Sequence, residues 1–522
     1  MQLSYLSFSQ ELSIDSFNIK NINWYNLDLQ ENKVLGTSVD LLYDSVLVNL
    51  KVKDTIVVAV IDGGVDIEHS DLAGKIWTNT DEIPGNQIDD DQNGYIDDIH
   101  GWNYIGNNDG KNIRYENYEY TRVIKTEQGT LNDIRVAEEL YNKELRKRLQ
   151  DSIDIERFKN VYSEAKAIIL KQTGIDVKSK NDLAKVNVTN VHAENARNLL
   201  NNVYANGFSE EILEELETDN KEYLNYFLNK EFDPRKIVGD DPLDINDKDY
   251  GNSDVKGPRS DHGTSVAGVI AAVRNNNLGI NGIAGPVKIM PLRVVPRGDE
   301  RDKDIALAIR YAVDNGARII NMSFGKRVSP QKAWVDSAVR YAMKHDVLMV
   351  HAAGNYGVNI DETGTFPSDR FLDGNEAENW LNIGASNKYL KKDLPGKFSN
   401  YGKKHVDVFA PGIDIVSLDS NNTYSMNDGT SLAAPVVTGI AALILSYYPD
   451  ITPPEMIDIL LEGSFKISKP RKVYQPNLLS TKKKKIKSSD LSKSGGVINA
   501  YNSFLIATER QNRPSAIQSG GE

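Results

Sequence analysis

The 522-residue sequence contains no cysteine. It therefore has no disulfide framework, no thiolate zinc site and no cysteine nucleophile. Basic residues are also in deficit, because 61 lysines and arginines face 74 aspartates and glutamates, which gives a net charge of −13. This balance argues against a protein whose main task is to bind nucleic-acid phosphate. The first residues lack the basic start and apolar centre of a secretory signal, and we expect no apolar run to reach the ~18–20 residues of a membrane span.

The rest of the composition is that of an ordinary soluble protein with a core, since 40% of the residues are hydrophobic and 26% are charged. The length allows several domains, or one large domain with insertions. Between residues 112 and 250 only four glycines and two prolines occur, which is typical of helical structure. The pattern predicts helices over residues 131–171, about 181–204 and 209–229, the last with Ser209 as its cap.

The second half of the chain alternates apolar β-type runs with amphipathic helices. Strands are predicted at residues 55–61, 287–295, 317–323 and 347–353, with helices near 302–315 and 330–344 between the later strands. Strand, helix and strand at this spacing indicate right-handed crossovers and an α/β fold whose parallel sheet is covered on both faces. Ligands of such folds bind at the carboxyl ends of the strands.

Four short motifs lie at those positions: Asp62 in VIDGGVD, His262 in DHGTSVAG, Asn355 in AAGN and Ser431 in GTSLAAP. Taken singly, the aspartate is more often a turn residue and the histidine a helix cap. The serine motif is more specific, because small residues surround a serine that opens an apolar helix. Together and in the order Asp, His, Ser, the motifs resemble the signature segments of the subtilisin-like serine peptidases, or subtilases. The match covers about residues 40–104 and 251–508.

The resemblance implies a subtilisin-like three-layer sandwich with a central, mostly parallel sheet, interrupted here by a largely helical insertion. It also implies a serine endopeptidase with a catalytic triad. Ser431 is then the nucleophile, His262 its general base, and Asp62 the group that fixes the histidine tautomer. The Ser431 backbone N–H and the Asn355 side chain are expected to stabilise the oxyanion.

By the same resemblance, the substrate pocket is lined by two short segments, and the peptide is expected to lie as an added strand beside the first of them. Phe324 suggests an apolar wall, although a role for this side chain in the core is equally open. The expected substrate-binding residues are Ser323, Phe324, Gly325, Ala353 and Gly354.

An acidic stretch before the insertion suggests a structural calcium ion. Asp89, Asp91, Asn93 and Asp97 occupy positions 1, 3, 5 and 9 of an EF-hand-like loop, with a glycine at position 6. A histidine replaces the glutamate expected at position 12, so another carboxylate, Asp98 or Asp90, would have to complete the ligands. A solvated acidic turn without an ion is the alternative.

These observations predict five segments. They are an N-terminal arm (1–54), the first part of the peptidase domain (55–110), a helical insertion (111–250), the second part (251–508, with a basic loop at about 466–494) and a disordered tail (509–522). Asp62 and His262 are 200 residues apart, so the insertion leaves and re-enters between two catalytic segments. We therefore expect it to overhang the cleft and restrict substrates, with a peripheral decoration as the alternative. The lysines at 482–485 and 487 are expected to form a solvated loop rather than an anion-binding surface.

Two other functions stay open for this sequence. One is a catalytically inactive subtilisin fold that serves as a binding or scaffold protein, and the other is a peptide ligase or cyclase on the same fold. The expected partners are protein or peptide substrates, with no nucleic acid and no transmembrane segment. A secreted, periplasmic or cell-envelope location is expected, although a cytoplasmic one stays open because the chain shows no signal peptide.

Overall fold

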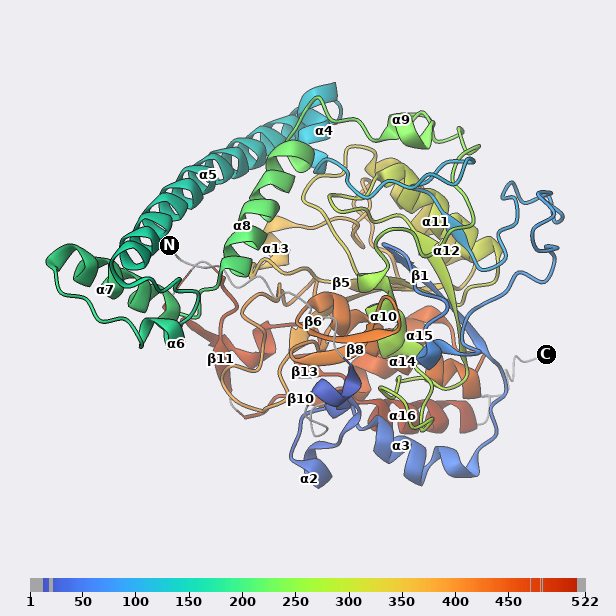
Figure 1. Cartoon of the computed structure of the whole chain (residues 1–522). Helices are drawn as coiled ribbons and strands as arrows, with labels where there is room; N and C mark the ends of the chain where they lie inside the picture. Colours follow the sequence, from blue (N-terminus) through green and yellow to red (C-terminus); the bar gives the residue numbers. More distant parts are fainter. Residues whose placement is uncertain (1–12, 18–21, 470, 479, 481, 514–522) are drawn as a thin grey trace, which may run out of the picture. The chain divides into compact units, whose positions relative to one another are not determined.

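The computed structural model describes residues 13–17, 22–469, 471–478, 480 and 482–513 (Figure 1). The chain forms two compact units. One unit comprises residues 1–114 together with 234–522, and the other comprises residues 115–233.

The first unit is built on a sheet of nine strands in the order β10-β13-β7-β6-β5-β4-β1-β3-β2. Its neighbouring strands are parallel except for the pair β10 and β13 at one edge. The strands are β1 (Ile56–Asp62), β2 (Trp102–Asn103), β3 (Val287–Arg293), β4 (Ile319–Met322), β5 (Leu348–Ala352), β6 (Trp380–Ser386), β7 (Val408–Pro411), β10 (Phe465–Lys466) and β13 (Gly496–Val497). The predicted α/β fold with a mostly parallel sheet is thereby confirmed.

The interior strand β1 is apolar on both faces because each face meets a separate core. Ile56, Val58 and Val60 belong to one hydrophobic cluster, whereas Ala59 and Ile61 belong to the other. Successive side chains of a strand point to opposite faces, so a strand covered on both sides reads as an uninterrupted apolar run. This explains why the run at 55–61 could be recognised in the sequence.

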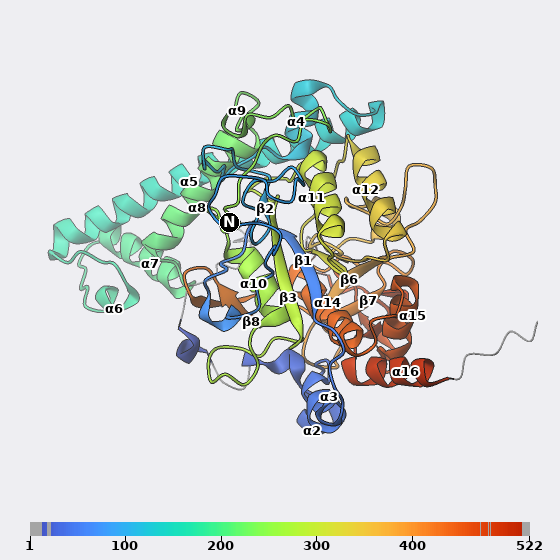
Figure 2. The same ribbon diagram turned by 90° about the vertical axis from the view of Figure 1, so that its right-hand side faces the viewer.

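Helices cover both faces of the sheet (Figure 2). On the first face lie α10 (Asp261–Ala271), α14 (Thr430–Tyr447), α15 (Pro453–Gly463) and α16 (Ala500–Asn512), and on the second face α11 (Asp302–Asp314) and α12 (Lys332–Lys344). The N-terminal arm contributes α2 (Leu29–Asn32) and α3 (Val39–Ser45), and its Trp24, Tyr25 and Leu42 are buried in the first core. The shorter helices of this unit are α9 (Arg235–Val238) and α13 (Ile360–Thr363).

The helix α14 corrects one expectation, because it is 18 residues long with a mean hydropathy of 1.6 and so meets the length and apolarity of a membrane span. In the structure, 94% of it is buried. It contacts β4, β5, β6 and β7, so it is a core helix of this unit.

Two hairpins extend the first unit. They are β8 (Ile415–Asp419) with β9 (Thr423–Asn427), and β11 (Lys472–Tyr474) with β12 (Lys485–Lys487). The second hairpin lies in the stretch predicted as a basic loop, so the last lysines of that run form a strand. The predicted disordered tail is wrong for residues 509–512, which continue α16, and Arg510 there pairs with Glu462 at 2.7 Å. Arg513 follows as the extended C-cap residue of the helix, and residues 514–522 lie outside the described residues.

The second unit is helical, with its own small core. Its long helix α5 (Leu131–Thr173) begins at a capping box of Thr130 and Asp133 and ends at Gly174 in the left-handed conformation. The other helices are α4 (Glu119–Thr126), α6 (Lys180–Leu183), α7 (Val191–Ala205) and α8 (Glu210–Glu222), which continues into a π-helical turn at 223–227. Apolar side chains of α5, α6 and α7 form one cluster.

One helix of this unit differs from the prediction. The stretch 181–204 is not a single helix, because α6 ends at Leu183 and Asn190 caps a new start for α7 by accepting a hydrogen bond from the Ala193 N–H at 2.9 Å. The intervening residues include β-branched Val186 and Val188, which lower helix propensity. Ser209 caps α8 as expected.

Candidate functional site

The carboxylate of Asp62 and the ring of His262 meet at the carboxyl end of the sheet. Asp62 is the last residue of β1, and its side chain is 2% exposed. Both of its oxygens accept hydrogen bonds from His262 Nδ1, at 2.8 and 3.0 Å, and one also accepts from the Gly63 N–H at 2.7 Å. Because Nδ1 donates to a carboxylate, the lone pair of Nε2 is left as the proton acceptor of the neutral ring.

The helix α10 can approach β1 this closely because it carries a glycine beside the histidine. A Cβ on Gly263 would lie 2.1 Å from the Gly64 carbonyl oxygen and 3.2 Å from Asp62 Cβ. The same glycine is part of the DHGTS motif. Its place in that motif follows from steric need, since any larger residue would push His262 away from Asp62.

The pKa of His262 is raised above its ordinary value of 6.5. Burial is the largest single influence and lowers the pKa, but the charge of Asp62 and the hydrogen bond to it together outweigh burial. The side chain is still 34% exposed, so the ring can both exchange protons with solvent and receive a hydroxyl proton.

Ser431 and Asn355 meet beside Gly429, at the start of α14. A Cβ at Gly429 would lie 2.7 Å from Ser431 Oγ, 3.6 Å from the Ser431 backbone nitrogen and 3.7 Å from Asn355 Nδ2. The backbone N–H and hydroxyl of Thr430 donate to Asn355 Oδ1, at 2.9 and 2.8 Å. These two bonds fix the amide, so that its NH₂ group stands beside the serine.

The serine is linked to the aspartate–histidine pair through a small cavity. Ser323 Oγ donates to the Ser431 carbonyl oxygen at 2.8 Å. Ser323 also lines a cavity of about 210 Å³, and the other residues of its wall are Asp62, Gly63, Arg259, His262, Val295, Pro296, Gly298, Asp299, Glu300, Phe324 and Gly325. Within the described residues, no hydrogen bond joins His262 directly to the Ser431 hydroxyl.

The expected substrate residues fall into two groups. Ser323, Phe324 and Gly325 line the cavity, and Phe324 is half-buried against the second core. Ala353 is fully buried, and Gly354 donates its N–H to Thr430 Oγ1 at 3.1 Å. The structure therefore brings the first segment to the cavity, whereas the second supports Thr430 and Asn355 from behind.

Two supporting residues were missed in the sequence. His351 is fully buried beneath the wall, where its ring bonds the Phe324 carbonyl oxygen and Asn382 Oδ1, each at 2.9 Å. Burial lowers the pKa of His351, which favours the neutral ring, so only one of its two ring nitrogens carries a proton and donates a hydrogen bond. Thr430 orients Asn355, and its position beside Ser431 in the GTS motif was the available signal.

The acidic loop places carboxylates together, but in a different combination from the predicted one. Oxygens of Glu82, Asp91 and Asp98 lie within 4.8 Å of one another. Of the four predicted ligands, Asp91 belongs to this cluster, and so does Asp98, one of the two carboxylates expected to complete the ligands. The Asn93 amide donates to Asp91 and Asp98 at 3.0 and 3.1 Å.

The other two predicted ligands contact the loop backbone. Asp89 accepts the N–H groups of Asn93 and Gly94, and Asp97 those of Gly85 and Gln87. Within the cluster, burial raises the pKa of both Glu82 and Asp98, and the neighbouring Asp91 raises both further. Buried like charges of this kind are relieved by a cation, and carboxylate oxygens suit calcium.

Comparison with known proteins finds one matching family model and several relatives that align with part of the chain. A sequence model described as the Subtilase family matches residues 53–483. A thermophilic serine proteinase of Bacillus sp. (strain AK1) is 39% identical over 221 residues, which are 42% of this chain and 49% of the relative. Thermitase of Thermoactinomyces vulgaris is 36% identical over 186 residues, 35% of this chain and 61% of the relative.

A cell wall-associated protease of Bacillus subtilis (strain 168) is 35% identical over 209 residues, 40% of this chain and 21% of the relative. The chain thus spans less than two thirds of the length of these relatives. Among solved structures, a prenylagaramide maturation protease, PagA, is 27% identical with a TM-score of 0.37, covering 47% of this chain and 82% of that one.

Proposed function

The chain belongs to the subtilase family, and from this premise we propose that it is a serine endopeptidase that hydrolyses peptide bonds through an acyl-enzyme on Ser431. The observation that carries the proposal is the 2.8 Å bond from His262 Nδ1 to Asp62. Both residues line a cavity whose wall also contains Ser323, the residue that donates a hydrogen bond to the Ser431 carbonyl oxygen. Three residues that are distant in sequence thus supply a nucleophile, a base and an orienting carboxylate at one edge of the sheet.

In the proposed reaction, Ser431 Oγ attacks the carbonyl carbon of the scissile peptide bond while His262 Nε2 takes the hydroxyl proton. Asp62 stabilises the imidazolium that forms. The same proton then passes from Nε2 to the leaving amine as the C–N bond breaks, which leaves an ester on Ser431. A water molecule, deprotonated by His262, attacks this ester; the acid is released as His262 Nε2 returns the proton to Ser431 Oγ.

The negative oxygen of each tetrahedral intermediate needs donors that are already in place. The Ser431 N–H and Asn355 Nδ2 both stand beside Gly429, and Thr430 holds the amide in that orientation. Preorganised donors of this kind each contribute ~10²–10³ to turnover.

We assign the substrate wall to Ser323, Phe324 and Gly325, which line the cavity next to His262. A substrate segment that lies extended beside them would bond the backbone as an added strand. The half-buried Phe324 ring favours an apolar side chain in the residue before the scissile bond.

A structural calcium ion is proposed at the acidic loop, with Glu82, Asp91 and Asp98 as carboxylate ligands. Calcium there supplies positive charge that neutralises three converging carboxylates and stabilises the loop. No step of the reaction requires it.

The proteases to which this chain is similar include one described as extracellular and one described as cell wall-associated. We propose a secreted or envelope location on that basis. The helical unit of residues 115–233 is proposed to restrict which substrates are cleaved. A deletion of this unit that left cleavage of folded proteins and of short peptides equally unchanged would refute this role.

Cleavage of a peptide library, followed by mass spectrometry of the products, tests the proposed function. The expected result is hydrolysed fragments from the wild-type protein and none from Ser431→Ala. Ligated or cyclised products would favour a peptide ligase instead. Equal patterns from both proteins would refute Ser431 as the nucleophile.

A further inference from the structure

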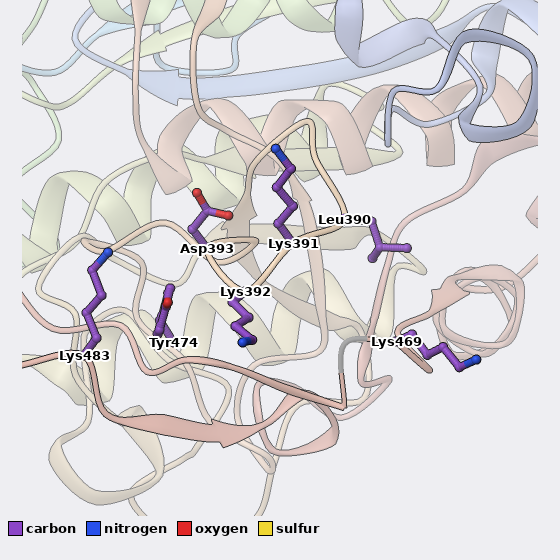
Figure 3. A pocket seen from close by; sticks show the side chains of 7 residues that line it. All are labelled: Leu390, Lys391, Lys392, Asp393, Lys469, Tyr474 and Lys483. Atoms are coloured by element: carbon purple, nitrogen blue, oxygen red, sulfur yellow. The ribbon is translucent and has the colours of Figure 1, made fainter.

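Lysine side chains gather in an open hollow on the first unit, of about 810 Å³. Figure 3 shows that they come from three separate stretches of chain. Lys391 and Lys392 follow β6, Lys469 precedes β11, and Lys483 precedes β12, with Tyr474 among them. One carboxylate, Asp393, also lines the hollow, so its side chains carry a net positive charge.

This charge stands out against the composition of the chain. Residues 464–489 contain nine lysines and arginines and no aspartate or glutamate, in a protein whose net charge is −13. All four lysines of the hollow are exposed. Ion pairs neutralise many other lysines, but within the described residues none is formed by these four.

The hollow is a built part of the fold. Val473 of β11 is buried in a core cluster and Ile486 of β12 packs against it, so the hairpin is anchored by its apolar side. The Tyr474 N–H donates to the Lys392 carbonyl oxygen at 2.6 Å. Lys483 Nζ stands 4.9 Å from the centre of the Tyr474 ring. The backbone that carries these lysines is therefore anchored, while each lysine side chain stays exposed and extends in its own direction around the hollow (Figure 3).

The basic hairpin segment also adjoins the proposed oxyanion site. A Cβ on Gly357 would lie 3.0 Å from the Leu478 nitrogen and 3.1 Å from Asn477 Cα, so this loop rests directly on Gly357. Gly357 is two residues after Asn355 in the sequence. Asn477 and Leu478, between β11 and β12, thus lie against the segment that carries Asn355.

We propose that the lysine hollow is an exosite that docks acidic segments of polypeptide substrates, outside the cleaved sequence. The inference rests on the proposed peptidase function. Charge complementarity and continuity with the substrate site favour a polypeptide, because the active site must already admit one. Flexible lysines around an open hollow match carboxylates spread along a chain better than one compact anion.

Two fluorogenic peptides that share one cleaved sequence test this exosite. One carries an oligoglutamate tract and the other a glycine–serine tract, each placed at either end in turn. With the tract at one of the two ends, the acidic peptide should have a KM about tenfold lower than that of the neutral peptide, at the same kcat. Each exposed charge pair contributes little to binding, but several together account for a change of this size. High salt should remove the difference.

The variant with Lys391, Lys392, Lys469 and Lys483 changed to Gln should lose the preference and still cleave the neutral peptide as the wild type does. A matched control changes four exposed lysines of the same unit to Gln, which alters the net charge equally; these are Lys51, Lys236, Lys248 and Lys344. Equal KM values for acidic and neutral peptides in the wild type, or an equal loss of preference in the control, would overturn the exosite.

Binding measured on Ser431→Ala separates this inference from the proposed activity. Fluorescence anisotropy of a labelled oligoglutamate should detect binding that the four Lys→Gln changes remove, whether or not any peptide is cleaved. A single-stranded oligonucleotide of equal charge serves as the competitor. If the oligonucleotide alone binds through these lysines and KM shows no acidic preference, the hollow is a nucleic-acid site and the inference is wrong.

Discussion

Replacing Asp62 with Asn should change both the rate and the pH dependence of peptide hydrolysis. The carboxylate is 2% exposed and accepts two contacts from His262 Nδ1, at 2.8 and 3.0 Å. An amide in its place can donate to the ring as readily as accept, so it no longer selects the tautomer with Nε2 unprotonated. We expect kcat to fall by about 10⁴, which corresponds to about 5 kcal/mol of transition-state stabilisation.

The dependence of kcat/KM on pH shows in which direction Asp62 shifts the pKa of His262. His262 must be neutral to act as the base, so kcat/KM of the wild type should rise with pH through a pKa above 6.5. In the Asp62→Asn variant, burial still lowers the pKa of His262, but the carboxylate that raised this pKa is no longer present. The rise of kcat/KM with pH should therefore occur at lower pH in the variant than in the wild type.

The assay is the initial rate of hydrolysis of one fluorogenic peptide across the pH range, and Asp66→Asn is the matched control. Asp66 is equally buried near the same loop, where it pairs with Lys256 at 2.9 Å, and no bond joins it to His262. The control should keep the wild-type pH dependence. An Asp62→Asn variant with an unshifted pH dependence and a kcat within tenfold of wild type would refute the reasoning.

Three further changes test other parts of the site. Asn355→Ala should lower kcat by ~10²–10³ with little change in KM, because it removes one oxyanion donor; a kcat within threefold of wild type, measured by the same assay, would contradict that role. Removing calcium with EGTA should lower the melting temperature of the wild type and leave that of Asp98→Asn nearly unchanged. If the wild type melts at the same temperature with and without EGTA, the structure does not depend on a calcium ion. Gly263→Ala should destabilise the fold by about 1–3 kcal/mol in urea unfolding, because its Cβ would overlap the Gly64 carbonyl; normal stability with full activity would contradict the close approach.

The fold was largely predictable because its main signals are local. Residues 56–61 are all apolar because both faces of β1 are buried. Ser209 marks the start of α8 because it satisfies a free backbone N–H there. The break between α6 and α7 depends on a single cap at Asn190, which an otherwise helical composition conceals.

The chemical residues were predictable in type, but their support was not. The motifs around Asp62 and His262 stand on a strand end and a helix start, so the order of the elements was enough to bring them together. His351 reaches the Phe324 carbonyl from the next strand of the sheet, a contact that only the tertiary fold creates.

The carboxylates that meet in the acidic loop could likewise not be predicted from the sequence alone. Counting positions selected Asp89 and Asp97, which in the structure accept backbone N–H groups of the loop. Glu82, which does join the carboxylate cluster, lies seven residues before Asp89 and outside any EF-hand spacing. Chain reversal within the loop brings it there, and no periodic pattern in the sequence records that reversal.

Covalent labelling with a fluorophosphonate probe tests most directly whether Ser431 is an activated nucleophile. The probe forms a stable ester with a serine whose proton a neighbouring base removes. We predict stoichiometric labelling of the wild type, mapped by peptide mass spectrometry to Ser431, with none on Ser431→Ala and strongly reduced labelling on His262→Ala. A correctly folded wild-type protein that remains unlabelled, or that is labelled at another serine, would contradict the account and favour a binding protein on a subtilase fold.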